Sequence, residues 1–273
     1  MLTDRTEMAR IARSEVMNVS SHMPESARWW KSHDGVRLAG DAWGDPGGVP
    51  VILLHGAGQT RHAWQRTGRL LADAGYHAIA FDARGHGDSD WPADGNYSQS
   101  AMVRDLECIA VSLGARRPVL IGAATGGATS LLAVGENYVD ARALILVNIA
   151  PQTEAGGVAR VQSFMRQRSP EDCDPYFVAW PRDMARRHRR LSACARKLAV
   201  PTLLMRGERS DVISEEGASE FLKLCPHAEY LTVRDAGHRV GKGNDVFGDA
   251  ALRFIERRAC AERPRARRLY ECA

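Results

Sequence analysis

The sequence predicts an α/β fold: a doubly wound, mostly parallel sheet of about eight strands, with helices on both faces and a short helical lid. Two observations support this prediction. Short apolar runs alternate with longer segments of helical period along most of the chain, and glycine-rich or polar turns directly follow several of those runs. Strand-helix alternation that repeats this often is typical of a parallel sheet covered on both faces.

The first expected elements form an antiparallel edge, from strands at residues 29–32 and 37–43. The later strands are expected to be buried and parallel, because each is a short run of apolar residues. They lie at residues 51–54, 77–81, 119–121, 143–147, 202–205 and 230–233. Helices are expected at residues 62–74, 98–113, 125–134, 215–224 and 246–257.

One segment, residues 151–198, interrupts this alternation. It has no strand pattern, and it carries several prolines, two aromatic anchors (Tyr176 and Trp180) and many arginines. It follows a strand whose carboxyl end lies where open α/β sheets bind ligands, so a lid over the site is expected. The predicted organisation is an N-terminal extension at 1–27 with a short amphipathic helix at 8–17, a domain at 28–258, and a basic tail at 259–273.

Composition excludes several classes of partner. Lysine and arginine total 37 against 33 acidic residues, so the net charge of +4 gives no argument for a nucleic-acid partner. Two basic runs, at 182–190 and 253–268, are expected to be a solvated helix face and a tail. No apolar stretch approaches the roughly 20 residues of a membrane span, and no signal-peptide core is visible. The six cysteines have no metal-like spacing, which favours reduced thiols and a cytoplasmic location.

Five motifs follow predicted strands in a fixed order. They read HGAG from His55, FDARGHGDS from Phe81, GAATGG from Gly122, GERSDVIS around Asp211 and DAGHR around His238. In this order the chain resembles the α/β-hydrolase fold superfamily of serine-hydrolase type over about residues 29–258. The resemblance implies a cofactor-free hydrolase of carboxylic esters or similar carbonyl compounds, acting on a small-molecule substrate.

The glycines around position 124 fit a nucleophile elbow, the tight turn that presents a catalytic residue. Such a turn needs small neighbours, because the residue at its tip is strained and nearby side chains would collide. Gly122, Gly126 and Gly127 supply that room. The backbone amides of Ala57 and Thr125 are then expected to form the oxyanion hole, and the side chain at the tip does not affect them.

The resemblance assigns His238 as general base and Asp211 as the carboxylate that orients it, in the chain order nucleophile, acid, histidine. At the nucleophile position, however, stands Ala124, whose methyl group cannot attack a carbonyl. Thr125 lies one residue past the tip, and later hydroxyls lie too deep in the helix. Loss of a triad nucleophile costs on the order of 10⁶ in turnover, so a strongly impaired hydrolase or a pseudoenzyme is expected.

Three explanations of the alanine stay open. A serine was deliberately replaced to trap a substrate, or natural loss of hydrolysis left a ligand-binding protein, or His238 acts as a base in a different, lyase-type reaction. The short lid favours a natural origin. The substrate and the oligomeric state are not specified by the sequence.

Other conspicuous residues receive structural interpretations. His55 is expected to stabilise its own loop through hydrogen bonds, and residues 82–86 to form a structural turn. Trp64, Trp91 and Trp180 are expected to pack in the core or anchor the lid more readily than to line a pocket. A dinucleotide-binding turn at 122–128 is a weak alternative, since its glycine spacing is imperfect and no acid follows the next strand.

Overall fold

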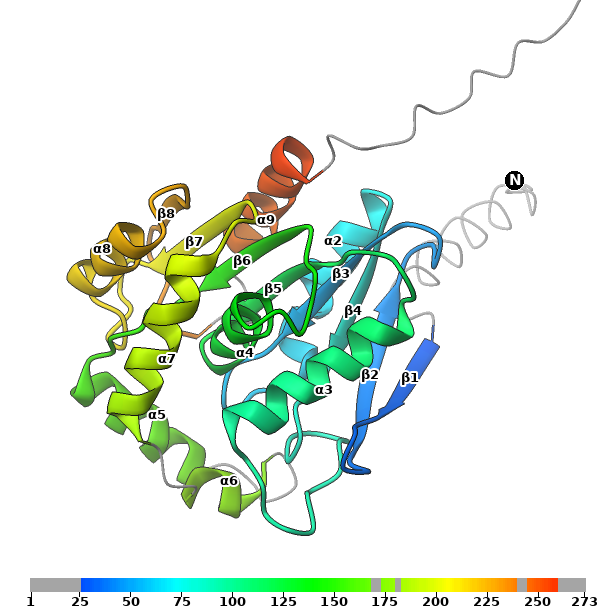
Figure 1. The fold of residues 1–273 in the computed structure, drawn as a ribbon, viewed down its shortest axis with the longest axis horizontal. Coiled ribbons are helices and arrows are strands. Elements are labelled where there is room, and N and C mark those ends of the chain that lie inside the picture. Colours follow the sequence, from blue (N-terminus) through cyan, green and yellow to red (C-terminus); the bar gives the residue numbers. More distant parts are fainter. Residues whose placement is uncertain (1–25, 168–172, 180–182, 240–244, 260–273) are drawn as a thin grey trace, which may run out of the picture.

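The computed structural model describes residues 26–167, 173–179, 183–239 and 245–259. Its centre is one eight-stranded sheet with the strand order β1-β2-β4-β3-β5-β6-β7-β8 (Figure 1). The strands are β1 (Ser26–Lys31), β2 (Arg37–Trp43), β3 (Val49–Leu54), β4 (Tyr76–Phe81), β5 (Val119–Ala123), β6 (Ala143–Val147), β7 (Thr202–Gly207) and β8 (Glu229–Val233). The predicted fold class is therefore confirmed.

Strand direction follows the expected pattern. β1 pairs antiparallel with β2, and β2 with β4, whereas all pairs from β4 to β8 are parallel. The chain leaves β3 towards β4 on one side and returns to β5 on the other, so the strand order reverses between β3 and β5. Leu54 stands beside Gly122 in that register. The loops after β3 and β5 therefore begin side by side, at the kind of switch point where α/β sheets bind ligands.

Helices cover both faces of the sheet because its strands are apolar on both faces. The helices are α2 (Gln65–Asp73), α3 (Gln99–Ser112), α4 (Thr125–Gly135), α5 (Ala155–Arg166), α6 (Pro175–Ala179), α7 (Met184–Lys197), α8 (Glu215–Leu224) and α9 (Asp245–Arg258), with a 3-10 turn η2 (Arg61–Trp64) before α2. On β3, Ile52 packs in the core with α3, α4, α7 and α8. Its neighbour Val51 packs in the second core, with α2 and α9. The alternation along each strand thus fills two hydrophobic layers.

The segment at 151–198 divides into two parts. α5 and α6 lie beyond the carboxyl ends of the strands (Figure 1), in the position expected of a lid. α7 instead packs against α4, and its Leu191 and Ala195 belong to the main core. The Asp183 side chain caps α7 by accepting the amide of Arg186 at 2.8 Å, which explains where this helix begins.

The remaining expectations fall partly outside the described residues. The helix expected at 8–17 and the end of the basic tail lie there, as does Trp180. Trp64 is buried in the core and Trp91 is 47% exposed, and neither is among the residues that line the cavity described below. Among the described helices, none combines the length and the apolar composition that crossing a membrane requires.

Candidate active site

The turn between β5 and α4 has the strained geometry of a nucleophile elbow. Ala124 sits at its tip with φ +46° and ψ −108°. A residue with a Cβ rarely adopts such a positive φ, and holding it there costs about 1–3 kcal/mol. The Ala124 amide donates a hydrogen bond of 2.9 Å to the carbonyl oxygen of Val147 on β6. The neighbouring strand therefore helps to hold the strained residue in place.

Two glycines make this turn possible. A Cβ at Gly122 would lie 2.5 Å from the carbonyl oxygen of Gly126, and a Cβ at Gly126 would lie 2.5 Å from that of Leu54. Both distances are far below van der Waals contact, so neither position accepts a side chain. The turn packs onto the end of β3 through contacts between backbone atoms. The close contacts at both glycines are made by backbone atoms and do not involve the side chain at position 124.

Two backbone amides beside this tip are the ones predicted to form an oxyanion hole. They belong to Ala57, in the loop after β3, and to Thr125, the first residue of α4, and both residues line the same cavity as Ala124. Within the described part of the chain, neither amide donates to a protein acceptor. Amides at a helix start and in a tight loop attract negative charge. An oxyanion hole made by these two amides stays a prediction.

Two buried histidines fix the loop that carries Ala57. His55 Nδ1 lies 2.8 Å from the Gly56 carbonyl oxygen, and its Nε2 accepts the amide of Ala83 at 2.9 Å. His86 Nε2 accepts the amide of Gly58 at 3.2 Å. Burial lowers the pKa of His55, so its ring is neutral and both nitrogens serve the loop. The structural interpretation of His55 agrees with these contacts.

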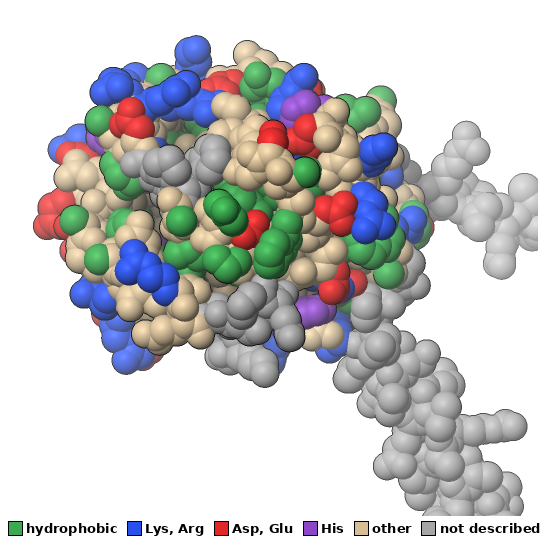
Figure 2. Space-filling view, turned by 90° about the horizontal axis from the view of Figure 1, so that it is seen from below, with side chains coloured by type: hydrophobic (Ala, Val, Ile, Leu, Met, Phe, Trp, Pro, Cys, Tyr) green, Lys and Arg blue, Asp and Glu red, His purple; other side chains and the backbone are tan. Residues whose placement is uncertain are grey.

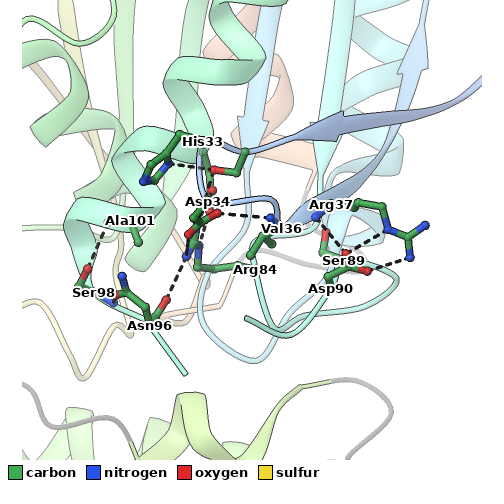
Figure 3. Close-up of polar contacts among 12 residues, drawn as sticks. His33, Asp34, Val36, Arg37, Arg84, Ser89, Asp90, Asn96, Ser98 and Ala101 are labelled. Atoms are coloured by element: carbon green, nitrogen blue, oxygen red, sulfur yellow. Dashed lines mark hydrogen bonds and ion pairs between the residues drawn. The ribbon is translucent and has the colours of Figure 1, made fainter. Parts of the chain in front are cut away.

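A buried arginine anchors the loop that follows β4 (Figure 3). Arg84 donates to both carboxylate oxygens of Asp105 on α3, at 2.6 and 2.7 Å. It also donates to Asp34 at 2.8 Å and to the backbone oxygen of Asn96 at 3.1 Å. Because these acceptors stabilise the charged form, the pKa of Arg84 is raised even though the side chain is buried. The loop is thereby tied to α3 and to the β1–β2 turn.

His238 and Asp211 reach the same cavity from the loops after β8 and β7. His238 Nδ1 lies 3.2 Å from the hydroxyl of Ser210, whereas Asp211 forms an ion pair of 2.5 Å with Nε of Arg160 on α5. Within the described residues, no hydrogen bond joins His238 to Asp211. The structure therefore brings His238 and Asp211 to one cavity, but the imidazole contacts the hydroxyl of Ser210 and not the carboxylate. Ser210 was not predicted as a partner from the sequence.

Burial lowers the pKa of His238 to about 4, and the positive charge of Arg239 acts in the same direction. The negative charge of Asp211 raises it, which means that the carboxylate is close enough to act on the ring through its field. At neutral pH the imidazole is uncharged. It is then able to accept a proton, although a pKa this low makes it a weak base.

The cavity that unites these residues has a volume of about 820 Å³. All five residues assigned from the sequence line it, namely Ala57, Ala124, Thr125, Asp211 and His238. The two nearby hydroxyls do not replace the missing nucleophile: Thr129 donates to the carbonyl oxygen of Thr125 at 3.0 Å, and Ser130 to that of Gly126 at 2.9 Å. Both are buried in the helix that they bond to.

Several arginines also line this cavity, which the sequence analysis did not anticipate. Three of them, Arg186, Arg187 and Arg190, come from the basic run that was expected to be a solvated helix face. That expectation holds for Arg189, which is exposed, and is wrong for Arg190, which is half-buried and paired with Glu136. The spacing of the three arginines along α7 places them on one side of the helix, and this periodicity was visible in the sequence.

Comparison with known proteins identifies the family. A family model described as alpha/beta hydrolase fold matches residues 49–190, and the chain belongs to this family. An esterase of Mycobacterium tuberculosis is 32% identical over 154 residues, which are 55% of this chain and 48% of the relative. A non-heme chloroperoxidase of Kitasatospora aureofaciens is 33% identical over 121 residues, 44% of this chain and 43% of the relative. The matched segments thus span less than half the length of these curated relatives.

Solved structures share the fold over most of their length. An alpha/beta hydrolase from Novosphingobium aromaticivorans superposes with a TM-score of 0.70 at 24% identity, covering 86% of this chain and 99% of the other. A serine-to-alanine mutant of a meta-cleavage product hydrolase from Pseudomonas fluorescens, complexed with acetates, gives a TM-score of 0.72 at 21% identity, covering 84% and 97%. At these identities the likeness concerns the fold alone.

Proposed function

We propose that this protein binds small carboxylic esters or related carbonyl compounds in its α/β-hydrolase cavity, and that Ala124 prevents the acyl-enzyme step. The observation that carries the proposal is the elbow itself. Ala124 has the strained backbone expected of a nucleophile position, and the amides of Ala57 and Thr125 beside it donate to no acceptor among the described residues. The esterase among the relatives supports an ester as the ligand class.

The proposed chemistry separates binding from turnover. Backbone amides bind the carbonyl oxygen whether or not a hydroxyl stands at position 124, because they do not involve that side chain. Without the hydroxyl, no covalent intermediate forms, and the rate falls by about 10⁶ relative to an intact triad. The remaining groups need no metal or organic cofactor for this role. The protein is then a ligand-binding member of a hydrolase family.

A second candidate function is slow hydrolysis by water. The neutral imidazole of His238 lines the cavity and is held by Ser210, which favours a role as a general base on a water molecule or on a substrate proton. Its lowered pKa weakens it as a base, so only activated esters are expected to react. Replacing His238 by alanine would abolish such turnover without removing ester binding.

The decisive experiment restores the hydroxyl with Ala124→Ser. We expect the variant to show a burst of product followed by steady hydrolysis of p-nitrophenyl acetate, at a rate about 10³-fold or more above the parent chain. Ala124→Gly, which adds no nucleophile, is the matched control and should stay at the parent rate. An Ala124→Ser variant that folds like the parent and remains inert would contradict the proposed function.

A further inference from the structure

The charges around the cavity are strongly unequal. Among the described residues that line it are six arginines and two aspartates. The arginines are Arg160, Arg186, Arg187, Arg190, Arg209 and Arg239, and the aspartates are Asp183 and Asp211. Figure 2 views the molecule from the side of α5 and α6, where hydrophobic side chains gather near the middle of the face and basic ones lie mainly towards its edge. A cavity with this lining attracts anions.

Most of these arginines already have partners. Arg160 pairs with Asp211 at 2.5 Å, Arg190 with Glu136 at 2.6 Å, and Arg209 with Asp235 at 3.2 Å. The Arg239 guanidinium stacks on the ring of Phe164, 3.9 Å from its centre. An ion pair neutralises much of the field of a guanidinium. These side chains therefore contribute less to anion binding than their number suggests.

Arg187 differs from them. Within the described part of the chain, its guanidinium makes one hydrogen bond, of 3.1 Å, to the carbonyl oxygen of Pro151, and it meets no carboxylate. Burial without a counter-charge lowers the pKa of Arg187 to about 10. A guanidinium has five N–H donors, so most of those of Arg187 have no acceptor among the described residues. A half-buried charge with no counter-charge among the described residues is costly, and an anionic ligand would offset that cost.

The rest of the lining indicates what kind of anion fits. Apolar side chains such as Val161, Met165 and Ile213 share the cavity with Arg187. A ligand that contacts both the apolar side chains and Arg187 has an apolar part and a single charged end. The half-buried Arg187 guanidinium, which has no counter-charge among the described residues, balances one negative charge, and its planar donor fork matches a carboxylate in a bidentate manner. Arg186, the other cavity arginine with no ion pair among the described residues, is exposed, so solvent and salt screen its charge and it adds less to the binding of a second negative charge.

We propose that the cavity selects esters that carry a free carboxylate, and that Arg187 binds this carboxylate while the amides beside Ala124 bind the ester carbonyl. This inference rests on the proposed function, because it assigns the substrate class of the same site. It makes Arg187 a specificity-determining residue. It also explains why Arg187, alone among the cavity arginines on α7, is both half-buried and without a carboxylate partner among the described residues.

The test uses the chain as it stands, since alanine at position 124 allows an ester to bind without acyl transfer. The probes are monomethyl glutarate, which has one ester and one carboxylate, and dimethyl glutarate, which has two esters and no charge. Isothermal titration calorimetry should give a Kd about 10- to 100-fold lower for the monomethyl ester. Arg187→Gln should remove this preference and leave the affinity for dimethyl glutarate unchanged.

Two further variants keep the test sharp. Arg187→Lys retains the charge without the fork, so an intermediate preference is expected. Arg189→Gln, an exposed neighbour on the same helix, should change neither affinity. Equal affinity for the two esters in the parent chain, or a preference that survives Arg187→Gln in a folded protein, would overturn the assignment of Arg187 while the ester-binding function stands. If neither ester binds and Ala124→Ser is inert, both proposals are wrong.

Discussion

The two sides of the candidate site are built in different ways. On the nucleophile side, the strained turn at Ala124 is held by backbone contacts with β3 and β6, and glycines leave no room for alternatives. On the acid-base side, Asp211 is exposed and bonds to Arg160, while His238 lies against Ser210. Backbone packing holds the turn at position 124 through contacts that do not involve its side chain. The geometry of Asp211 and His238 instead depends on which neighbouring side chain each of them bonds to.

The largest effect is expected when the acid-base side is removed after a nucleophile has been restored. In the Ala124→Ser background, His238→Ala should lower kcat for p-nitrophenyl acetate by about 10³-fold or more, because His238 is the only imidazole among the described residues that line the cavity. Thr129→Ala in the same background is the control, since that hydroxyl is bonded to its own helix. Equal losses in both variants would show that His238 has no special role.

The second effect tests the nucleophile side by stability. Gly126→Ala forces a Cβ to within 2.5 Å of the Leu54 carbonyl oxygen, so the free energy of unfolding should fall by about 3 kcal/mol. Gly156→Ala is the matched control in α5, where the nearest atom is 3.9 Å away, and it should be neutral or stabilise by up to about 1 kcal/mol. Urea denaturation of both variants measures the difference. Similar losses would mean that the turn is less tightly packed than described.

The same contrast explains what the sequence predicted well. Strands and the elbow were found within a few residues, because apolar runs and required glycines are local signals that packing reinforces. β5, for example, was expected at 119–121 and extends to Ala123, directly before the tip. The residues that converge from separate loops, such as Ala57 and His238, could be assigned only through the order of motifs along the chain.

What the sequence missed concerns competition between side chains. Asp211 pairs with Arg160, which lies 51 residues away along the chain, and His238 contacts Ser210. Neither pairing has a local signal in the sequence. The half-buried position of Arg187 likewise depends on how α7 packs against α4. A basic run alone does not tell a solvated arginine from one that lines a cavity.

A smaller effect sharpens the acid-base side of the comparison. Arg160→Ala should release Asp211 to interact more closely with His238, and in the Ala124→Ser background kcat should rise about tenfold as the imidazole becomes a stronger, better oriented base. Arg209→Ala is the control, because this cavity arginine pairs with Asp235 and not with Asp211. An unchanged or lower rate for Arg160→Ala would mean that Asp211 orients nothing.

The smallest effect concerns pH. The pKa of His238 is lowered from about 6.5 in an unfolded chain to about 4 in the fold, so between these values the unfolded chain binds the extra proton and the folded one does not. The free energy of unfolding is therefore expected to fall as the pH drops from 6.5 towards 4, with His238 contributing on the order of 1 kcal/mol once solvent screening is allowed for. Urea denaturation across this range should show a smaller fall for His238→Gln. The control is His62→Gln, at a side chain that is 61% exposed, where the parent slope should persist. If His238→Gln also keeps the parent slope, the imidazole of His238 is solvated. The acid-base side of the site is then more accessible to solvent than the nucleophile side.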